Sequence, residues 1–254
     1  MKIAILSRYP RADRLHWKRH LIEKLLQKGH TLFIVYGDSS FWHHFKAGLA
    51  KYGLHDLLKV YLTKKKMLGG TEDPGYGGKL LKDFAKEKRI PVYFTKNLNS
   101  RRSERLFKKL SPSLMILAGT QIMKPYILQK SEKGVLNGHF GLLPEIRGMD
   151  TIEWSIVKNK PIGITIHSVD PGVDTGDILS RKIVDLNGCF TLALIRERCR
   201  QTVTNELSRI VEEIENDKVE RLCQAPNDGK QYFRMNKFFQ EKMSERLKLM
   251  GSNQ

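Results

Sequence analysis

The sequence predicts an α/β protein, with a mostly parallel sheet flanked by helices and a short helical tail at the C-terminus. Short apolar runs that are typical of buried strands alternate with longer stretches whose apolar residues recur at helical spacing. The chain opens with strand, helix and strand in succession, and such a unit makes its strands parallel through a right-handed crossover. The 254 residues, of which 40% are hydrophobic, are enough for one large domain.

The first strand–helix–strand unit is visible in the apolar pattern. Residues 3–6 are an apolar run, and residues 16–28 place leucines at the spacing of one helix face. Gly29 ends this helix, and residues 31–36 form the second apolar run. The loop after the first strand contains neither GxGxxG nor GxxxxGK, so we expect no dinucleotide site and no P-loop there.

The middle of the chain continues this alternation. Residues 41–62 have helical spacing in two pieces, and residues 63–78 have the lysine- and glycine-rich composition of a loop. Such a loop either closes over a substrate or is disordered. The next segments have the patterns of a helix, a strand, a basic helix and a buried strand, at residues 79–88, 91–94, 101–110 and 113–118.

Composition and charge limit the functional classes. No apolar run approaches the roughly 20 residues that span a bilayer, and the apolar run at residues 3–6 is too short for a signal peptide. The three cysteines form no CxxC pair, so we expect a reducing cytoplasm and no zinc site. The net charge of +18 favours anionic partners such as a nucleotide-linked substrate or a nucleic acid, although scattered lysines more often form only a solvated surface.

The most informative stretch lies between residues 135 and 179. Asn137 and His139 follow an apolar run, where we expect a buried strand to end in a loop. A β-patterned segment at residues 162–169 leads into a polar loop that contains Asp174. Ligands of open α/β sheets bind at such strand-to-loop edges. An amide, an imidazole and a carboxylate brought together there could serve acyl transfer, as oxyanion donors and as a proton acceptor.

The order of several motifs in this stretch resembles one enzyme family. The motifs are N-x-H, LLP, RG, a tryptophan, G-x-T and D-T-G, at residues 137–139, 142–144, 147–148, 154, 163–165 and 174–176. This series resembles the formyltransferases that use 10-formyltetrahydrofolate, and the resemblance covers approximately residues 80–185. It implies a single Rossmann-like domain that transfers a formyl group from this donor to an amine, without a metal.

The resemblance also implies roles for individual residues. Asn137 would donate its amide N–H to the developing oxyanion, and His139 would add a donor or exchange a proton. Asp174 would raise the basicity of the imidazole and help to take the proton of the attacking amine. His167 is expected to be structural or to lie at the pocket edge. The residues expected to hold the folate donor are Thr120, Gln121, Ile122, Met123, Leu142 and Asp170, and those expected to bind the acceptor are Arg8, Arg147 and Gly148.

The C-terminal part bears on the acceptor. Residues 191–216 are apolar at helical spacing, and a turn and a basic helix follow. By resemblance, tRNA formyltransferases carry a C-terminal β-barrel domain, and too few residues remain here for one. We therefore expect a catalytic domain over residues 1–190, a helical C-terminal extension over residues 191–254, and a nucleotide-linked amino sugar as the anionic small-molecule acceptor.

Three alternatives stay open. The acceptor could be an aminoacyl-tRNA, above all methionyl-tRNA. The chain could also be a non-catalytic folate- or nucleotide-binding module, although such a module has no need of an Asn, a His and an Asp together. Hydrolysis of the formyl donor is the third, but the hydrolases of the family carry an N-terminal regulatory domain, and this chain begins with a strand. A homodimer through the C-terminal segment is compatible with the sequence, and we expect no membrane partner.

Overall fold

The structure of the chain is a computed structural model that describes residues 1–8, 16–37, 80–189, 191–225 and 228–252. The helical segment that the sequence predicts at residues 41–62 and the loop predicted at residues 63–78 lie outside the described residues.

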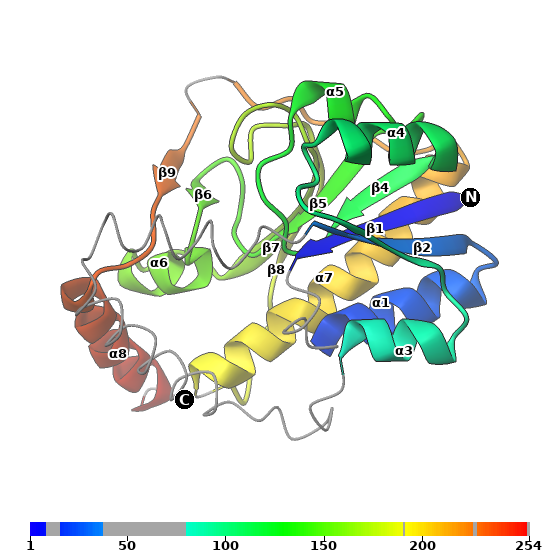
Figure 1. The fold of residues 1–254 in the computed structure, drawn as a ribbon. Coiled ribbons are helices and arrows are strands. Elements are labelled where there is room, and N and C mark those ends of the chain that lie inside the picture. Colours follow the sequence, from blue (N-terminus) through cyan, green and yellow to red (C-terminus); the bar gives the residue numbers. More distant parts are fainter. Residues whose placement is uncertain (9–15, 38–79, 190, 226–227, 253–254) are drawn as a thin grey trace, which may run out of the picture.

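Within the described residues, a seven-stranded sheet forms the centre of the molecule (Figure 1). Its strands stand in the order β3-β2-β1-β4-β5-β7-β8. The first five strands of this order run parallel, and β7 runs antiparallel to both of its neighbours. The strand bounds are β1 Lys2–Arg8, β2 Thr31–Gly37, β3 Val92–Thr95, β4 Leu114–Leu117, β5 Val135–His139, β7 Gly163–Ser168 and β8 Ile178–Ile183.

Helices cover both faces of this sheet (Figure 1). In β1, Ile3 and Ile5 face one helical layer, whereas Ala4 and Leu6 face the other. Because both faces are buried, the strand is apolar at consecutive positions instead of alternating with polar residues. One layer consists of α1 His16–Gln27, α3 Leu81–Glu87 and α7 Leu192–Glu215, and the other of α4 Arg101–Leu110 and α5 Pro125–Leu128.

The long helix α7 is part of the main core. It begins after Thr191, whose hydroxyl accepts a hydrogen bond from the N–H of Leu194 at 3.2 Å, as expected of an N-cap. One face of α7 then packs into the same cluster of buried side chains as Ile3 and Ile5 of β1. The buried apolar side chains on that face are Ile195, Cys199, Val203, Leu207, Ile210, Val211 and Ile214.

A smaller unit lies beside the sheet. Strand β6 (Ile146–Gly148) pairs in parallel with β9 (Lys230–Tyr232), next to α6 (Thr151–Val157) and α8 (Lys237–Ser252). Trp154 of α6 holds this unit together. Its indole N–H donates to the carbonyl of Phe233 at 2.8 Å, and its ring centroid lies 5.0 Å from that of Tyr232. We call residues 221–225 and 228–235 the C-terminal strap. This segment follows α7 in the sequence, begins beside β8, passes β6 and leads into α8.

The predicted α/β class with a mostly parallel sheet and a C-terminal helix is confirmed, and two local expectations were wrong. Asn137 and His139 lie within β5, not in a loop after it, because β5 continues to pair with β7 as far as His139. The sequence also predicts that Trp154 packs against the sheet with its N–H partnered. The N–H is partnered, but the ring packs against the strap and not against the seven-stranded sheet.

Candidate active site

Strand β5 presents Asn137 and His139 on one face because Gly138, between them, must face the other way. A Cβ at Gly138 would lie 2.7 Å from Cγ1 of Val203 on α7, so only glycine allows this close approach of helix and strand. Successive strand residues point to opposite faces. The close packing of α7 on one side of β5 therefore fixes the direction of both polar side chains on the other side.

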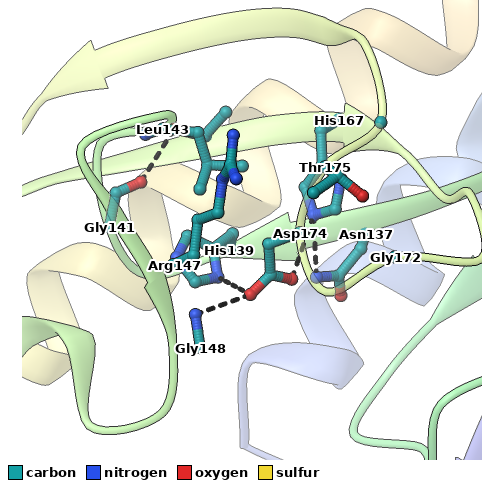
Figure 2. A network of polar contacts seen from close by, with 12 residues as sticks. Asn137, His139, Gly141, Leu143, Arg147, Gly148, His167, Gly172, Asp174 and Thr175 are labelled. Carbon is teal, nitrogen blue, oxygen red and sulfur yellow. Dashed lines mark hydrogen bonds and ion pairs between the residues drawn. The ribbon is translucent and has the colours of Figure 1, made fainter. Parts of the chain in front are cut away.

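The side chain of Asn137 is oriented by His167, its partner across the β5–β7 pair. Nδ1 of His167 lies 2.7 Å from the carbonyl of Ser168 and must donate to it, which leaves Nε2 of the neutral ring as an acceptor. The amide nitrogen of Asn137 lies 3.1 Å from that Nε2 and donates to it (Figure 2). The register of two strands thus sets which end of the amide faces the histidine.

Asp174 lies at the centre of the polar network in Figure 2. Its Oδ2 accepts from the backbone N–H of Gly148 at 2.8 Å and lies 3.5 Å from Nδ1 of His139, and its Oδ1 lies 3.6 Å from Nε2 of His167. Burial on its own would raise the pKa of Asp174. The interactions with His167, His139 and Gly148 outweigh burial and lower the pKa to about 2. The side chain is therefore a carboxylate at neutral pH.

His139 lies behind Asp174, with only 5% of its surface exposed. Its Nε2 is 2.8 Å from the carbonyl of Ile146 and must donate to it, so Nδ1 of the neutral ring faces the carboxylate without a proton. Burial lowers the pKa of His139, and the charge of Asp174 opposes that effect only in part. The lowered pKa favours the neutral ring.

A cavity of about 780 Å³ opens beside Asn137 and Asp174. It lies at the carboxyl ends of β1 and β4, where open α/β sheets bind ligands. Of the residues that the sequence predicted for the site, nine line it: Arg8, Thr120, Gln121, Ile122, Met123, Asn137, Gly148, Asp170 and Asp174. The structure thus brings most of the predicted site into one place.

Three predicted site residues do not line the cavity. His139 is shielded by Asp174, as described above. Leu142 packs beside Gly163 of β7, where a Cβ on that glycine would lie 2.4 Å from its Cδ2. Arg147 is 7% exposed, and Nη2 of its guanidinium lies 3.4 Å from Oε1 of Gln224. Neither Leu142 nor Arg147 lines the cavity, so a donor contact of Leu142 and an acceptor contact of Arg147 stay predictions.

Two parts of the site were missed from the sequence. His167 lines the cavity and contacts both Asn137 and Asp174, so it is more than an edge residue. Its signal was present, because polar Thr165 and His167 alternate with Ile164 and Ile166 along β7. The second part is the wall formed by Gln231, Tyr232 and Phe233, which comes from the C-terminal strap. No local motif marks that segment.

Metal sites and membrane spans are both absent from the part of the chain that the structure describes. Within those ranges, no three His, Cys, Asp or Glu side chains converge as a metal site would require. Among the helices that the structure describes, none combines the length and the apolar character of a membrane span.

The fold and the cavity define an α/β protein with a polar site at the carboxyl edge of its sheet, suited to acyl transfer chemistry. Residues 30–211 match the family model described as formyl transferase. This match covers more than half of the chain, so the chain belongs to the formyl transferase family, and the resemblance drawn from the sequence motifs is confirmed.

Individual relatives differ in the acceptor that their names give. The chain is 30% identical over 166 residues to methionyl-tRNA formyltransferase of Clostridium perfringens (strain SM101 / Type A). The matched stretch covers 60% of this chain and 54% of that protein. The chain thus spans about half the length of such relatives.

Its fold is similar to that of an N-formyltransferase from Helicobacter canadensis solved with folinic acid and dTDP-3-aminofucose. The TM-score is 0.63 and the identity 16%, with coverage of 100% of this chain and 82% of that one. It is also similar to phosphoribosylglycinamide formyltransferase from Bacillus halodurans, with a TM-score of 0.58, 19% identity and coverage of 85% and 98%.

Proposed function

We propose that this protein transfers a formyl group from 10-formyltetrahydrofolate to the amine of a small-molecule acceptor, an amino sugar carried on a nucleotide. The observation that carries this proposal is the convergence of Asn137, His167 and Asp174 on one cavity. These three side chains supply a neutral donor, a proton acceptor and a carboxylate, which are the groups needed for the attack of an amine on a formyl carbon.

Each side chain has a distinct task in this scheme. The amide N–H of Asn137 donates to the formyl oxygen as negative charge develops on it, and the loss of one such donor costs on the order of 100-fold in rate. Nε2 of His167 gives up its hydrogen bond from Asn137 and accepts the proton that the attacking amine sheds. The carboxylate of Asp174, 3.6 Å away, then stabilises the resulting imidazolium. With a pKa of about 2, Asp174 is a weak base, so we assign it this electrostatic task in place of proton abstraction.

The cavity suits the folate donor, which supplies the formyl group. Its wall between β4 and α5 combines backbone polar groups with apolar side chains, as sites for flat heterocycles do. Met123 is buried at the base of this wall, and Ile122 is 66% exposed at its rim. Thr120, Gln121, Ile122, Met123 and Asp170 are the residues that we assign to this donor.

The opposite wall is assigned to the acceptor. Arg8 lies at the end of β1, and its guanidinium matches the geometry of a phosphate. Phe233 of the strap and Met149 after β6 also line the cavity and add exposed apolar surface. A cation beside apolar surface suits a nucleotide-linked sugar, and the net charge of +18 is compatible with such an anion.

A second candidate acceptor is methionyl-tRNA. The identity of 30% to methionyl-tRNA formyltransferases favours it, since that likeness exceeds the 16% identity to the sugar enzyme. A tRNA substrate would bind through several phosphates, so its binding would weaken steeply as salt is raised. This salt dependence separates the two acceptors.

The test measures release of tetrahydrofolate from 10-formyltetrahydrofolate with a panel of nucleotide-linked amino sugars and, in parallel, with charged initiator tRNA. Asn137→Ala and Asp174→Ala test the site, and Gln201→Met, on the exposed side of α7, serves as the control. We expect turnover with one amino sugar, abolished or strongly reduced in the two site variants alone.

Turnover with tRNA alone would replace the acceptor proposed here. Absence of turnover with every acceptor, together with binding of the donor, would reject the transfer reaction and leave the binding module.

A further inference from the structure

The position of Asp174 depends on an unusual backbone conformation. Its φ is +55°, in the left-handed region, which is strained for a residue with a Cβ. Such a conformation persists where surrounding contacts hold it. The side-chain contacts of Asp174 with Gly148, His139 and His167 end at the carboxylate, so a further group must fix the backbone from which the carboxylate projects.

Gln224 of the C-terminal strap makes that contact. Its amide nitrogen lies 3.1 Å from the carbonyl of Asp174 and 2.6 Å from the carbonyl of Gly176. Both carbonyls can only accept, so both N–H bonds of the Gln224 amide are used on this loop. A single side chain therefore ties the loop on both sides of Thr175.

The direction of the Gln224 amide is itself determined. Its Oε1 accepts from Nη2 of Arg147 at 3.4 Å, and a guanidinium can only donate. Arg147 is 7% exposed and forms no ion pair with any described residue, and its buried Nε has no hydrogen-bond partner there. Gly148, the next residue, donates its N–H to Asp174. Gly148 thus contacts Asp174 directly, whereas Arg147 reaches the Asp174 loop through Gln224.

The strap is anchored close to Gln224. Leu222 pairs with Ile178 of β8 through two backbone hydrogen bonds of 2.8 and 2.9 Å. Gln224 therefore approaches the loop from a segment that is fixed on the sheet. It also lies outside residues 30–211, the part that matches the family model.

We propose that Gln224 is a positioning residue for Asp174 in formyl transfer, and that Arg147 orients Gln224 for this task. This inference rests on the proposed function. The structure brings together the Gln224 amide, the Asp174 and Gly176 carbonyls and the buried guanidinium as one unit that sets where the carboxylate lies.

Two substitutions remove the donors in different ways. Gln224→Met keeps the length of the side chain without polar atoms. Gln224→Glu keeps an oxygen for Arg147, which aids folding, but presents no donor to the two carbonyls. Both variants should lower kcat roughly 10- to 100-fold, because a small misplacement of a catalytic group can cost about 100-fold. The KM values should change little, since Gln224 does not line the cavity.

A double-mutant cycle tests whether the effect acts through the carboxylate. In an Asp174→Asn background, Gln224→Met should reduce kcat no further, because the group that Gln224 positions is already gone. Independent losses that multiply would overturn the inference.

A second readout requires no acceptor. The ring ¹⁵N resonances of His139 and His167 report the nearby carboxylate, and in Gln224→Met and Gln224→Glu they should move towards their positions in Asp174→Asn. In Gln201→Met they should stay in place. Unmoved resonances in both Gln224 variants would overturn the inference, as would moved resonances with wild-type kcat. If the wild-type protein turns over no acceptor, the proposed function fails, and the resonances alone decide whether Gln224 positions Asp174.

Discussion

Gly148 offers a sharp test of how the strap is joined to the loop that contains Asp174. Its φ is +96°, and a Cβ built on it would lie 2.1 Å from the carbonyl oxygen of Tyr232 in β9. In Gly148→Ala these atoms must separate by about 1.3 Å, from 2.1 Å to an ordinary contact of 3.4 Å. β9 and the Gly148 N–H that binds Asp174 would then move apart.

The cost has two parts that a matched control separates. Gly134, before β5, has φ +90°, and a Cβ there would meet nothing within 4 Å. Gly134→Ala should therefore cost only the left-handed strain of about 1–2 kcal/mol. Gly148→Ala should cost that strain and about 1–3 kcal/mol more for the forced displacement of β9.

Urea unfolding at pH 7 measures both variants against the wild-type protein. The rate of formyl transfer gives a second comparison, because displacement of the donor to Asp174 should lower kcat about 100-fold in Gly148→Ala and leave Gly134→Ala at the wild-type rate. If the two variants are equally stable and equally active, then the approach of β9 to Gly148 does not fix the site, and this reasoning is refuted.

Three further outcomes follow from the contacts described. The folded-state pKa of Asp174 is about 2, below its ordinary 3.8, so its contribution to stability is present above about pH 4 and is lost as the pH falls towards 2. In urea titrations between pH 4.5 and 3, the wild-type protein should lose about 1 kcal/mol more stability than Asp174→Asn, and equal losses would contradict the assigned pKa. Trp154→Phe leaves the carbonyl of Phe233 without its hydrogen-bond donor and should lower the free energy of unfolding by about 2 kcal/mol. No change would mean that other contacts hold the strap. Phe233→Ala removes a side chain that is 68% exposed, so the free energy of unfolding should change by less than about 0.5 kcal/mol while the KM of the acceptor rises. An unchanged KM would place the acceptor on another wall.

The sheet was predictable because local pattern and tertiary environment agree there. The run at residues 3–6 is apolar because both faces of β1 are buried, and Gly29 follows α1 with φ +78° as a helix end requires. Strands β6 and β9 have three residues each, too few for any period to be visible. They exist because their backbones pair with each other across more than 80 residues of sequence.

The site was predictable in its chemistry but not in its layout. The motif order identified Asn137, His139 and Asp174, yet it could not tell which imidazole faces the cavity. That depends on the β5–β7 register, which places His167 opposite Asn137. Arg147 was assigned to the acceptor through the RG motif of the resemblance, whereas tertiary packing buries it beside Gln224. Gln224 carries no local signal, because its partners are carbonyl groups that every residue possesses.

The place of the strap near the end of the chain has a consequence for biosynthesis. During synthesis the strands of the seven-stranded sheet are complete once residue 183 has left the ribosome, and α7 completes most of the buried core by residue 215. A nascent chain of that length can bury its apolar surface and escape chaperones that bind such surface, because domains fold as units while synthesis continues. Gln224 and the wall at residues 231–233 emerge later. Folding of the sheet thereby precedes assembly of the proposed site, which waits for the polar contacts of the strap.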